Sequence, residues 1–247
     1  MKNGELILLI NEKNYYVVEK SDKKVQTADG IVDLKKIKKF DSIVKASTGR
    51  KYFVARPSLN DILRKKVKRM PQIIMPKDAA LILAYTGALP GSTVVDAGAG
   101  TGYLSIFLAN YLKPGRIVTY EKNKNFATVA KENFKSSRLA KFIILKQKDI
   151  RKGISEKNVD LITLDMQYAE SVVKHAYAAL KYGGWLVVYS PYIEQVKKVV
   201  SQMKRKGFSE VKTVENIVRS WDVREHTLPQ RSGIMHTGFI TFARKVK

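Results

Sequence analysis

The segment from residue 94 to residue 104, VVDAGAGTGYL, constrains the fold more than any other part of the chain. Its two valines predict the end of a buried strand, and residues 103–111 predict a helix. The glycines between them stand at alternate positions, which allows a tight turn with exposed backbone amides: Gly98, Gly100 and Gly102. A strand, a glycine-rich turn and a helix in this order hold a nucleotide-like ligand close to backbone N–H groups.

The glycine spacing favours S-adenosylmethionine as that ligand. The dinucleotide fingerprint needs Gly-x-Gly-x-x-Gly, whereas this turn is Gly-x-Gly-x-Gly. Asp96 precedes the turn, and we expect it to place a negative charge beside the ligand, which suits an ammonium and a sulfonium better than two phosphates. We therefore predict that the cofactor is held by the turn and the start of the helix: Gly98, Gly100, Thr101, Gly102, Tyr103 and Leu104.

Acids at the ends of the next two predicted strands extend this site. Glu121 follows the strand 116–120, where a carboxylate accepts both ribose hydroxyls, and Lys122 beside it is assigned to the same site. Asp149 follows the strand 142–145, and an acid there can accept the exocyclic amine of an adenine ring. Taken singly, Glu121 can also be a solvated loop acid and Asp149 a helix cap.

A fourth strand end supplies the predicted catalytic group. Residues 159–164 are apolar enough for a central parallel strand, and Asp165 follows them at the place to which the methyl group should project. For an adenine N1 acceptor, Asp165 would accept a hydrogen bond from the exocyclic amine, and Tyr168 could stack on the base. The alternative is that Asp165 only caps a helix that begins near residue 169.

The net charge points to an anionic partner. The chain has 247 residues, with 46 Lys and Arg against 22 Asp and Glu, for a net charge of +24. Such a charge favours a polyanion, nucleic acid first, although a lysine-rich surface can also serve solubility or heat resistance. With no cysteine and only three histidines we expect no metal site. No apolar run reaches 18 residues and no signal peptide is evident, so we expect a cytoplasmic protein without a membrane partner.

The pattern of the chain changes near residue 60, which predicts two domains, 1–60 and 61–247. The first carries short alternating apolar runs typical of a small antiparallel β domain (6–10, 15–18, 31–34, 43–45 and 52–54). Positive charge is dense here, since residues 1–70 hold 18 Lys and Arg against 8 Asp and Glu.

After residue 71 strands and helices alternate, which predicts a doubly wound α/β sheet that binds ligand at the carboxyl ends of its strands. Further strands are expected at 93–95 and 185–189, with an antiparallel edge pair at 211–218 and 238–243. The expected helices are 79–85, 126–133, 169–180 and 193–206, the third of them ended by Gly183 and Gly184.

Four stretches of the chain resemble the TrmI-type tRNA (adenine-N1)-methyltransferases. They are residues 56–61 followed by 71–78, the glycine turn with Glu121, Leu164-Asp165, and residues 219–223 with 236–239. The resemblance implies a Rossmann-like class I methyltransferase sheet with a small N-terminal β domain that is a candidate for tRNA binding. It also implies N1 methylation of adenine in the tRNA T-loop at position 58, with 57 as a second position, a homotetramer, Asp165 as the catalytic aspartate and Gln72 near the cofactor.

Two departures from the family pattern leave alternatives open. Members often carry Asp-Leu-Pro-x-Pro-Trp at the fourth strand, whereas residues 165–170 read DMQYAE, so Tyr168 is the nearest stacking residue. Met75 stands where Tyr or His is often found. A methyltransferase of the same fold that acts on another RNA or on a protein, and a non-catalytic RNA-binding subunit, therefore remain as other readings.

Overall fold

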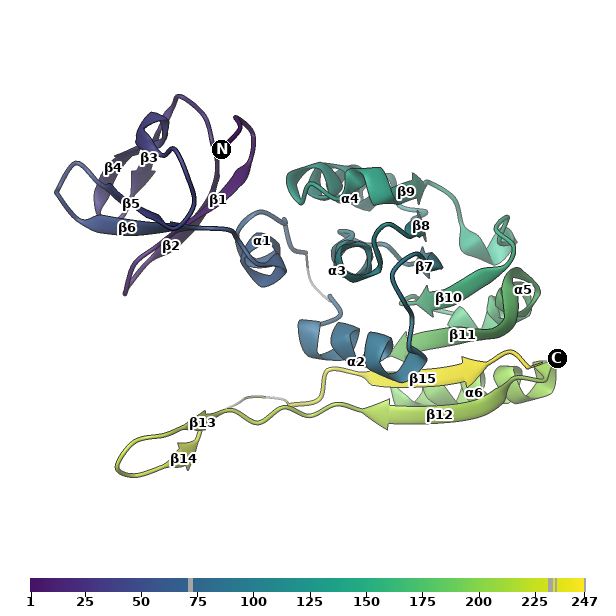
Figure 1. The fold of residues 1–247 in the computed structure, drawn as a ribbon. Coiled ribbons are helices and arrows are strands. Elements are labelled where there is room, and N and C mark those ends of the chain that lie inside the picture. The colour runs from purple at the N-terminus through teal and green to yellow at the C-terminus, as the bar shows by residue number, and fades with distance from the viewer. Residues whose placement is uncertain (71–72, 231–232, 234, 247) are drawn as a thin grey trace. The chain divides into compact units, whose positions relative to one another are not determined.

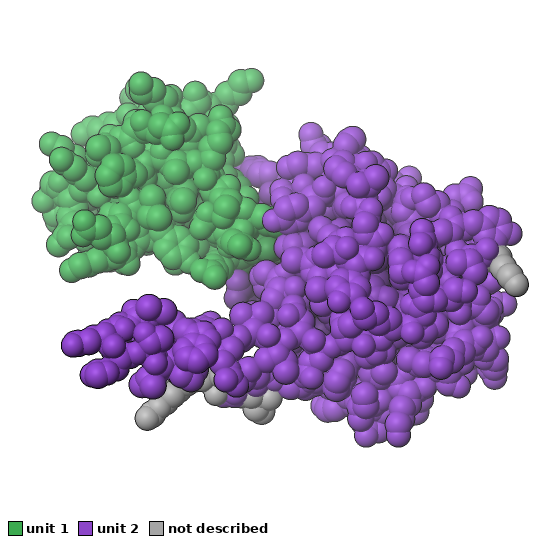
Figure 2. Space-filling view, turned by 60° about the horizontal axis from the view of Figure 1, so that its bottom comes forward, with its two compact units in different colours: residues 1–67 green, residues 68–247 purple. Residues whose placement is uncertain are grey.

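A computed structural model describes residues 1–70, 73–230, 233 and 235–246 and divides the chain into two compact units. Unit 1 is Met1–Val67 and unit 2 is Lys68–Lys247, coloured separately in Figure 2. The boundary between the units follows Val67 in the chain, whereas the sequence places the change of pattern at residue 60. The intervening residues form a helix, α1 (Leu59–Lys65), whose Ile62 packs on strands of unit 1.

Unit 1 is built on a four-stranded antiparallel sheet in the order β2-β1-β6-β5. Its strands are β1 (Leu6–Ile10), β2 (Tyr15–Glu19), β5 (Ser42–Lys45) and β6 (Lys51–Ala55). A separate hairpin pairs β3 (Lys24–Thr27) with β4 (Gly30–Asp33), which a short 3₁₀ turn, η1 (Leu34–Lys36), follows. Alternate side chains such as Ile7, Leu9, Tyr52 and Val54 form the core. The β3 strand has a single apolar residue, Val25, which is why the hydrophobic pattern missed it.

Unit 2 contains the predicted α/β sheet, with seven strands in the order β12-β15-β11-β10-β7-β8-β9 (Figure 1). Five strands run parallel: β7 (Thr93–Ala97), β8 (Arg116–Tyr120), β9 (Ile143–Lys146), β10 (Val159–Leu164) and β11 (Leu180–Ser190). The expected antiparallel pair at one edge is confirmed as β12 (Ser209–Glu215) and β15 (Phe239–Arg244). This parallel arrangement brings the ends of β7, β8 and β10 to one edge of the sheet.

Helices cover both faces of this sheet (Figure 1). The helices are α2 (Pro76–Thr86), α3 (Tyr103–Leu112), α4 (Lys124–Ser136), α5 (Val173–Ala179) and α6 (Ile193–Lys206). Helices α5 and α6 pack on the face that carries Val95 and Ile162, and α3 lies on the opposite face. Short 3₁₀ turns follow or precede strands at η2 (Ala140–Phe142), η3 (Ile150–Lys152) and η4 (Ala169–Ser171). Across the described ranges, no helix is long and apolar enough to cross a membrane.

The prediction that Gly183 and Gly184 end a helix is wrong. Helix α5 ends at Ala179, and both glycines lie inside β11. A Cβ on Gly184 would lie 2.9 Å from the carbonyl oxygen of Val159, so the glycine permits close approach of the neighbouring strand. The absence of a side chain, which makes glycine common at helix ends, here accommodates a shift in the β10–β11 register between Val159 and Leu161.

A projecting two-stranded ribbon connects β12 to β15 (Figure 1). It pairs β13 (Trp221–Asp222) with β14 (Leu228–Pro229). The strand predicted to reach residue 218 ends at Glu215, where this ribbon begins.

Substitution of Ile162 by alanine should test the central position of β10. Ile162 is fully buried between β11 and β7. Removing its side chain should lower the free energy of unfolding by about 2–5 kcal/mol, as measured by urea denaturation, because a cavity replaces packed atoms. Leu89→Ala is the control, since Leu89 is 70% exposed. A loss below about 1 kcal/mol for Ile162→Ala would contradict this account.

Candidate functional site

The glycine turn joins β7 to α3, and its glycines have different roles. All three have positive φ, 71° at Gly98, 52° at Gly100 and 80° at Gly102. A Cβ on Gly98 would lie 1.9 Å from the carbonyl oxygen of Asp165, and one on Gly102 would lie 2.3 Å from the Phe134 ring. A Cβ on Gly100 would meet nothing closer than 3.9 Å. Two glycines thus allow close packing, while the third leaves the turn open to a ligand.

Asp96, which was expected to place a negative charge beside the ligand, is buried and bonded to three hydroxyls rather than exposed at the turn. Its side chain is 2% exposed and lies beneath the turn. It accepts hydrogen bonds from Ser105 on α3 (2.5 Å), Thr119 on β8 (3.0 Å) and Thr163 on β10 (2.7 Å). Burial raises the pKa of Asp96, and the three hydroxyl donors oppose that rise. Asp96 therefore ties the neighbouring strands and α3 together under the turn.

A hollow of about 380 Å³ lies at the carboxyl edge of the sheet. Six predicted site residues line it: Gly98, Gly100, Thr101, Glu121, Lys122 and Asp165. Residues that were not predicted complete the lining: Met70, Ile73, Asn123, Phe126, Met166, Gln167, Tyr189, Pro191, Tyr192 and Gln195. The structure thus brings the turn and two of the strand-end acids into one cavity.

Glu121 braces the glycine turn from the end of β8. Its carboxylate is buried and accepts the N–H of Gly100 (2.9 Å) and the N–H of Asn123 (2.8 Å). A carboxylate offers about four acceptor positions. Two acceptor positions of Glu121 therefore remain, one for each of two ribose hydroxyls.

Asp165 is held at the end of β10 by its backbone, and its side chain faces the hollow. Its N–H donates to the carbonyl of Ala97 (2.8 Å). Within the described part of the chain, no group donates a hydrogen bond to its carboxylate. Burial, with a smaller contribution from the charge of Asp96, raises the pKa of Asp165 to about 7. It does not cap the following helix, because the N-cap of η4 is Tyr168 and no side chain caps that turn.

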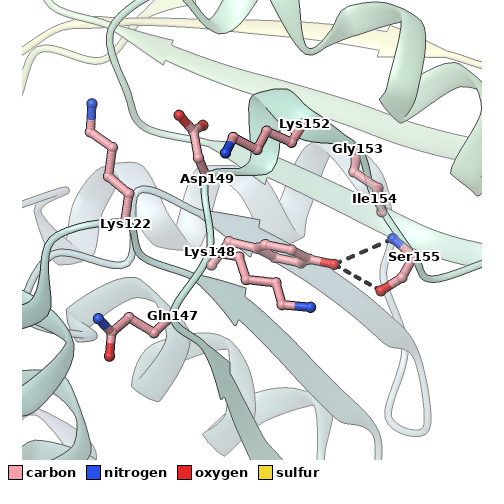
Figure 3. Close-up of a pocket in the computed structure, with 9 residues that line it drawn as sticks. Lys122, Gln147, Lys148, Asp149, Lys152, Gly153, Ile154 and Ser155 are labelled. Carbon is pink, nitrogen blue, oxygen red and sulfur yellow. Dashed lines mark hydrogen bonds between the residues drawn. The ribbon is translucent and has the colours of Figure 1, made fainter.

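Asp149 lies in a second hollow of about 780 Å³, which shares Lys122 with the first. Figure 3 shows it beside Lys148 and Lys152. Its carboxylate is paired with Arg151, whose Nη2 lies 2.5 Å from Oδ2, and it caps η3 through the Arg151 N–H. The hydrogen bonds from Arg151 lower the pKa of Asp149 to about 2. Its predicted role toward the cofactor would therefore need acceptor positions that Arg151 leaves free.

Three further predicted residues do not line the first hollow: Tyr103, Leu104 and Tyr168. Tyr103 and Leu104 are buried in the first turn of α3. Tyr168 is 59% exposed with φ of 60° and does not line the hollow. Gln72 is outside the residues that the structure describes. The roles of these four residues remain predictions.

One wall of the hollow was not predicted from the sequence. It comes from the end of β11 and the start of α6, and Tyr189 is its most constrained member. The Tyr189 hydroxyl donates to the carbonyl of Thr237 (2.5 Å), and burial raises its pKa to about 12. Tyr189 could have been found as the end of the fifth predicted strand, but Tyr192 and Gln195 required the path of the following loop.

An ion pair between the partly exposed Lys77 and the buried Asp78 anchors this wall. Asp78 is fully buried at the start of α2 and pairs with Lys77 at 2.8 Å. Lys77 Nζ and Asp78 also bond the Thr237 hydroxyl, at 2.9 Å and 3.0 Å. Lys77 further donates to the carbonyl of Asn216 (2.5 Å). Lys77 and Asp78 belong to one stretch that resembles the methyltransferase family and Thr237 to another, and the two stretches meet at these residues beside Tyr189.

The residues of the first hollow fit S-adenosylmethionine. The hydroxyl of Thr101 is buried without a hydrogen-bond partner among the described residues, so it is available to a ligand. Gly100 leaves room beside the turn, and Glu121 retains acceptor positions for ribose hydroxyls. Over the same described residues, no group of three or more metal-ligating side chains gathers.

The sheet order, the glycine turn and the strand-end acid Glu121 define a class I S-adenosylmethionine-dependent methyltransferase. Solved structures agree with this class. An S-adenosylmethionine-dependent O-methyltransferase from Thermotoga maritima superimposes with a TM-score of 0.86 at 30% identity, over 100% of this chain and 95% of that one. A tRNA (m1A58) methyltransferase TrmI from Aquifex aeolicus has the same fold, with a TM-score of 0.79 at 21% identity, over 100% of this chain and 99% of that one.

Sequence comparison narrows the class to a family. Residues 60–235 match the family described as tRNA methyltransferase complex GCD14 subunit. The tRNA (adenine(57)-N(1)/adenine(58)-N(1))-methyltransferase TrmI of Methanocaldococcus jannaschii is 36% identical over 96% of this chain and 94% of that protein. The tRNA (adenine(58)-N(1))-methyltransferase TrmI of Thermus thermophilus is 29% identical over 83% and 81%. The chain belongs to the GCD14/TrmI family of methyltransferases.

Asp165→Asn should make the protein more stable at neutral pH. The folded-state pKa of about 7 exceeds the unfolded value of 3.8, so the unfolded chain ionises first as the pH rises. Wild-type stability attributable to this group therefore falls between about pH 4 and pH 7, by up to about 4 kcal/mol. Asp165→Asn should not lose stability in this way, because its amide does not ionise. Urea denaturation of both proteins from pH 4 to pH 8 measures the difference, and a difference that stays constant would contradict the raised pKa.

Proposed function

We propose that this chain is a catalytic tRNA (adenine-N1)-methyltransferase that uses S-adenosylmethionine and forms 1-methyladenosine in the T-loop. Position 58 is the proposed acceptor, and position 57 is a second, because the relative from M. jannaschii is named for both. The observation that carries the proposal is the carboxylate of Asp165. It lies without a donor from the described residues in the same hollow as the glycine turn and Glu121, in a member of this family.

The chain offers contacts for each part of the cofactor. The turn from Gly98 to Gly102 would surround the amino-acid and ribose portions, with Thr101 supplying a free hydroxyl. Glu121 would accept the ribose hydroxyls, and Lys122 with Asp149 would border the adenine. Gln72, Tyr103 and Leu104 are kept as further contacts on the strength of their positions in the sequence. The bound cofactor supplies an electrophilic methyl group.

Asp165 would act on the acceptor base rather than as a proton acceptor at the reacting atom. Adenine N1 has an in-plane lone pair and loses no proton when it is methylated, so no general base is needed. The reaction leaves a positive charge on the ring. An ionised Asp165 that accepts a hydrogen bond from the exocyclic amine would stabilise this charge, and a hydrogen bond to a charged group contributes about 1.5–3 kcal/mol.

The surroundings of Asp165 suit this role. Burial removes water that would compete for its carboxylate, which strengthens a hydrogen bond to a base that becomes cationic. Tyr189, Pro191 and Tyr192 form the opposite wall and would confine the base to a narrow range of positions. Tyr168 is exposed at the rim, where an extruded nucleotide could stack on it.

The other readings make different predictions. A non-catalytic RNA-binding subunit has no need of the cofactor turn, Glu121 and Asp165 in one hollow, which favours a catalytic chain. A methyltransferase of the same fold could instead act on another RNA or on a protein. The net charge of +24 favours RNA over protein as the acceptor.

We also propose a homotetramer, supported by the projecting ribbon. Residues 217–228 of the ribbon expose large apolar side chains, with Val223 79%, Leu228 64% and Trp221 52% exposed. Apolar surface of this kind is typical of an interface. Light scattering after size-exclusion chromatography measures the oligomeric state directly.

A tRNA acceptor would also agree with a cytoplasmic location.

Incubation with labelled S-adenosylmethionine and an unmodified tRNA transcript tests the reaction. The wild type should yield 1-methyladenosine by nucleoside mass spectrometry. Asp165→Ala should lower kcat/KM by about 10- to 100-fold, because the stabilising hydrogen bond is lost. Glu170→Gln, which removes a charge outside the hollow, is the control. A 2′-O-methylated nucleoside, or methylation of protein alone, would overturn the proposed acceptor.

The pH dependence of methyl transfer should follow the ionisation of Asp165. Only the carboxylate form makes the charge-assisted hydrogen bond, so kcat/KM should rise with pH and level off above about pH 7. Asp165→Asn should be slower and should lack this rise, since its acceptor oxygen does not titrate. A rise that persists unchanged in Asp165→Asn would assign the titration to another group.

A further inference from the structure

The four-stranded sheet of unit 1 has an inner face and an outer face. Tyr52, Val54 and Val44 point inward to the core. The intervening residues of β5 and β6 point the other way and are exposed: Ile43, Lys45, Lys51 and Phe53. Strand alternation therefore places these four side chains together on the outer face.

Helix α1 covers only part of this outer face. Leu6, Leu8 and Val17 on β1 and β2 form a small apolar cluster, and Ile62 of α1 packs against it. This cluster is buried in the ordinary way. The half of the outer face formed by β5, β6 and the end of β1 lies beyond it.

Three apolar side chains form a row across the uncovered half. Phe53 stands between Ile10 on β1 and Ile43 on β5, each directly paired with it in register. Phe53 is 56% exposed, Ile43 53% and Ile10 38%. An exposed aromatic ring flanked by aliphatic side chains presents a flat apolar platform, which we call the Phe53 platform (Ile10, Phe53 and Ile43).

Two lysines border the platform and face each other across the strands. Lys45 and Lys51 are direct partners in the β5–β6 ladder, two residues along from the Ile43–Phe53 pair. Like charges directly opposite on one face of a sheet are destabilising. In the portion that the structure describes, neither lysine forms an ion pair with an acid. An anion between them would relieve this repulsion.

We propose that the Phe53 platform binds RNA by stacking an unpaired nucleobase, with Lys45 and Lys51 contacting the neighbouring phosphates. Every base has a face that can stack on an aromatic ring, and lysines that follow the backbone are the usual complement. The inference deepens the proposed function, on which it rests, by giving unit 1 a defined way to hold the RNA substrate.

The test measures binding of fluorescently labelled single-stranded RNA and tRNA transcript to the full chain by anisotropy. Phe53→Ala should raise Kd about tenfold, within the range for loss of one stacked base, whereas Phe53→Tyr should stay within about twofold. Ile31→Ala is the control, since Ile31 is 44% exposed on β4 outside this sheet. In methyl-transfer assays Phe53→Ala should raise KM for tRNA and leave kcat unchanged.

The lysines are tested by salt dependence. Lys45→Gln with Lys51→Gln should reduce the slope of log Kd against log salt by about 1.4, for two single-strand phosphate contacts of about 0.7 each. Lys23→Gln with Lys24→Gln makes the same charge change on the β3 side of unit 1 and should leave the slope nearly unchanged. Equal loss of slope in both pairs would show a general charge effect and overturn the assignment.

The other outcomes also decide the question. Unchanged RNA affinity in Phe53→Ala, or equal loss in Phe53→Tyr, would overturn stacking. If Phe53→Ala differed from the wild type in molecular mass by light scattering but not in RNA affinity, the platform would be a contact between copies, and the proposal would be overturned. If the wild type methylated no tRNA, the proposed function would fail, while the anisotropy measurements would still decide whether the platform binds RNA.

Discussion

The close approach of Gly98 to the carbonyl oxygen of Asp165 is the contact on which the candidate site depends. No other residue fits at position 98, because a Cβ there would lie 1.9 Å from that oxygen. The N–H of Asp165 reinforces the contact by donating to Ala97 on the same strand as the turn. The cofactor turn and the end of β10 are therefore held against each other by backbone. This contact sets where an acceptor carboxylate stands relative to the glycine turn.

Asp96 supports that contact from below and also shapes its electrostatics. A carboxylate buried among three hydroxyl donors links α3, β8 and β10, so three elements around the site are bonded to one side chain. Its charge adds to the desolvation of Asp165 and helps raise the pKa of that group. The buried Asp96 thus raises the pKa of Asp165, the acid that lines the hollow. The same burial that makes Asp165 costly for folding makes it a strong partner for a base that becomes positively charged.

The far wall of the hollow depends on a different constraint. Lys77 and Asp78 lie some 160 residues before Thr237 in the chain, yet the three side chains share one partly buried network. Replacing a buried ion pair by apolar residues is often neutral for stability, so its value lies in fixing one arrangement. Here that arrangement holds the carbonyl that receives the Tyr189 hydroxyl. The base of the projecting ribbon and the wall of the hollow are consequently set by the same contacts.

Local sequence determined most of the strands, the glycine turn and the acids at the strand ends, because alternation and glycine spacing act over a few residues. Since parallel strands end at one edge, the sequence alone was enough to place Gly98, Glu121 and Asp165 in one site. The tertiary structure decided which way each side chain faces and what it meets. Asp96 is buried and accepts hydrogen bonds from three hydroxyls, and Asp149 forms an ion pair with Arg151. The tertiary structure also placed Gly184 inside a strand against Val159 and brought Lys77 and Asp78 to Thr237. Those outcomes depend on contacts between segments far apart in the chain, and such contacts cannot be predicted from a hydrophobic pattern, which reflects only neighbouring residues.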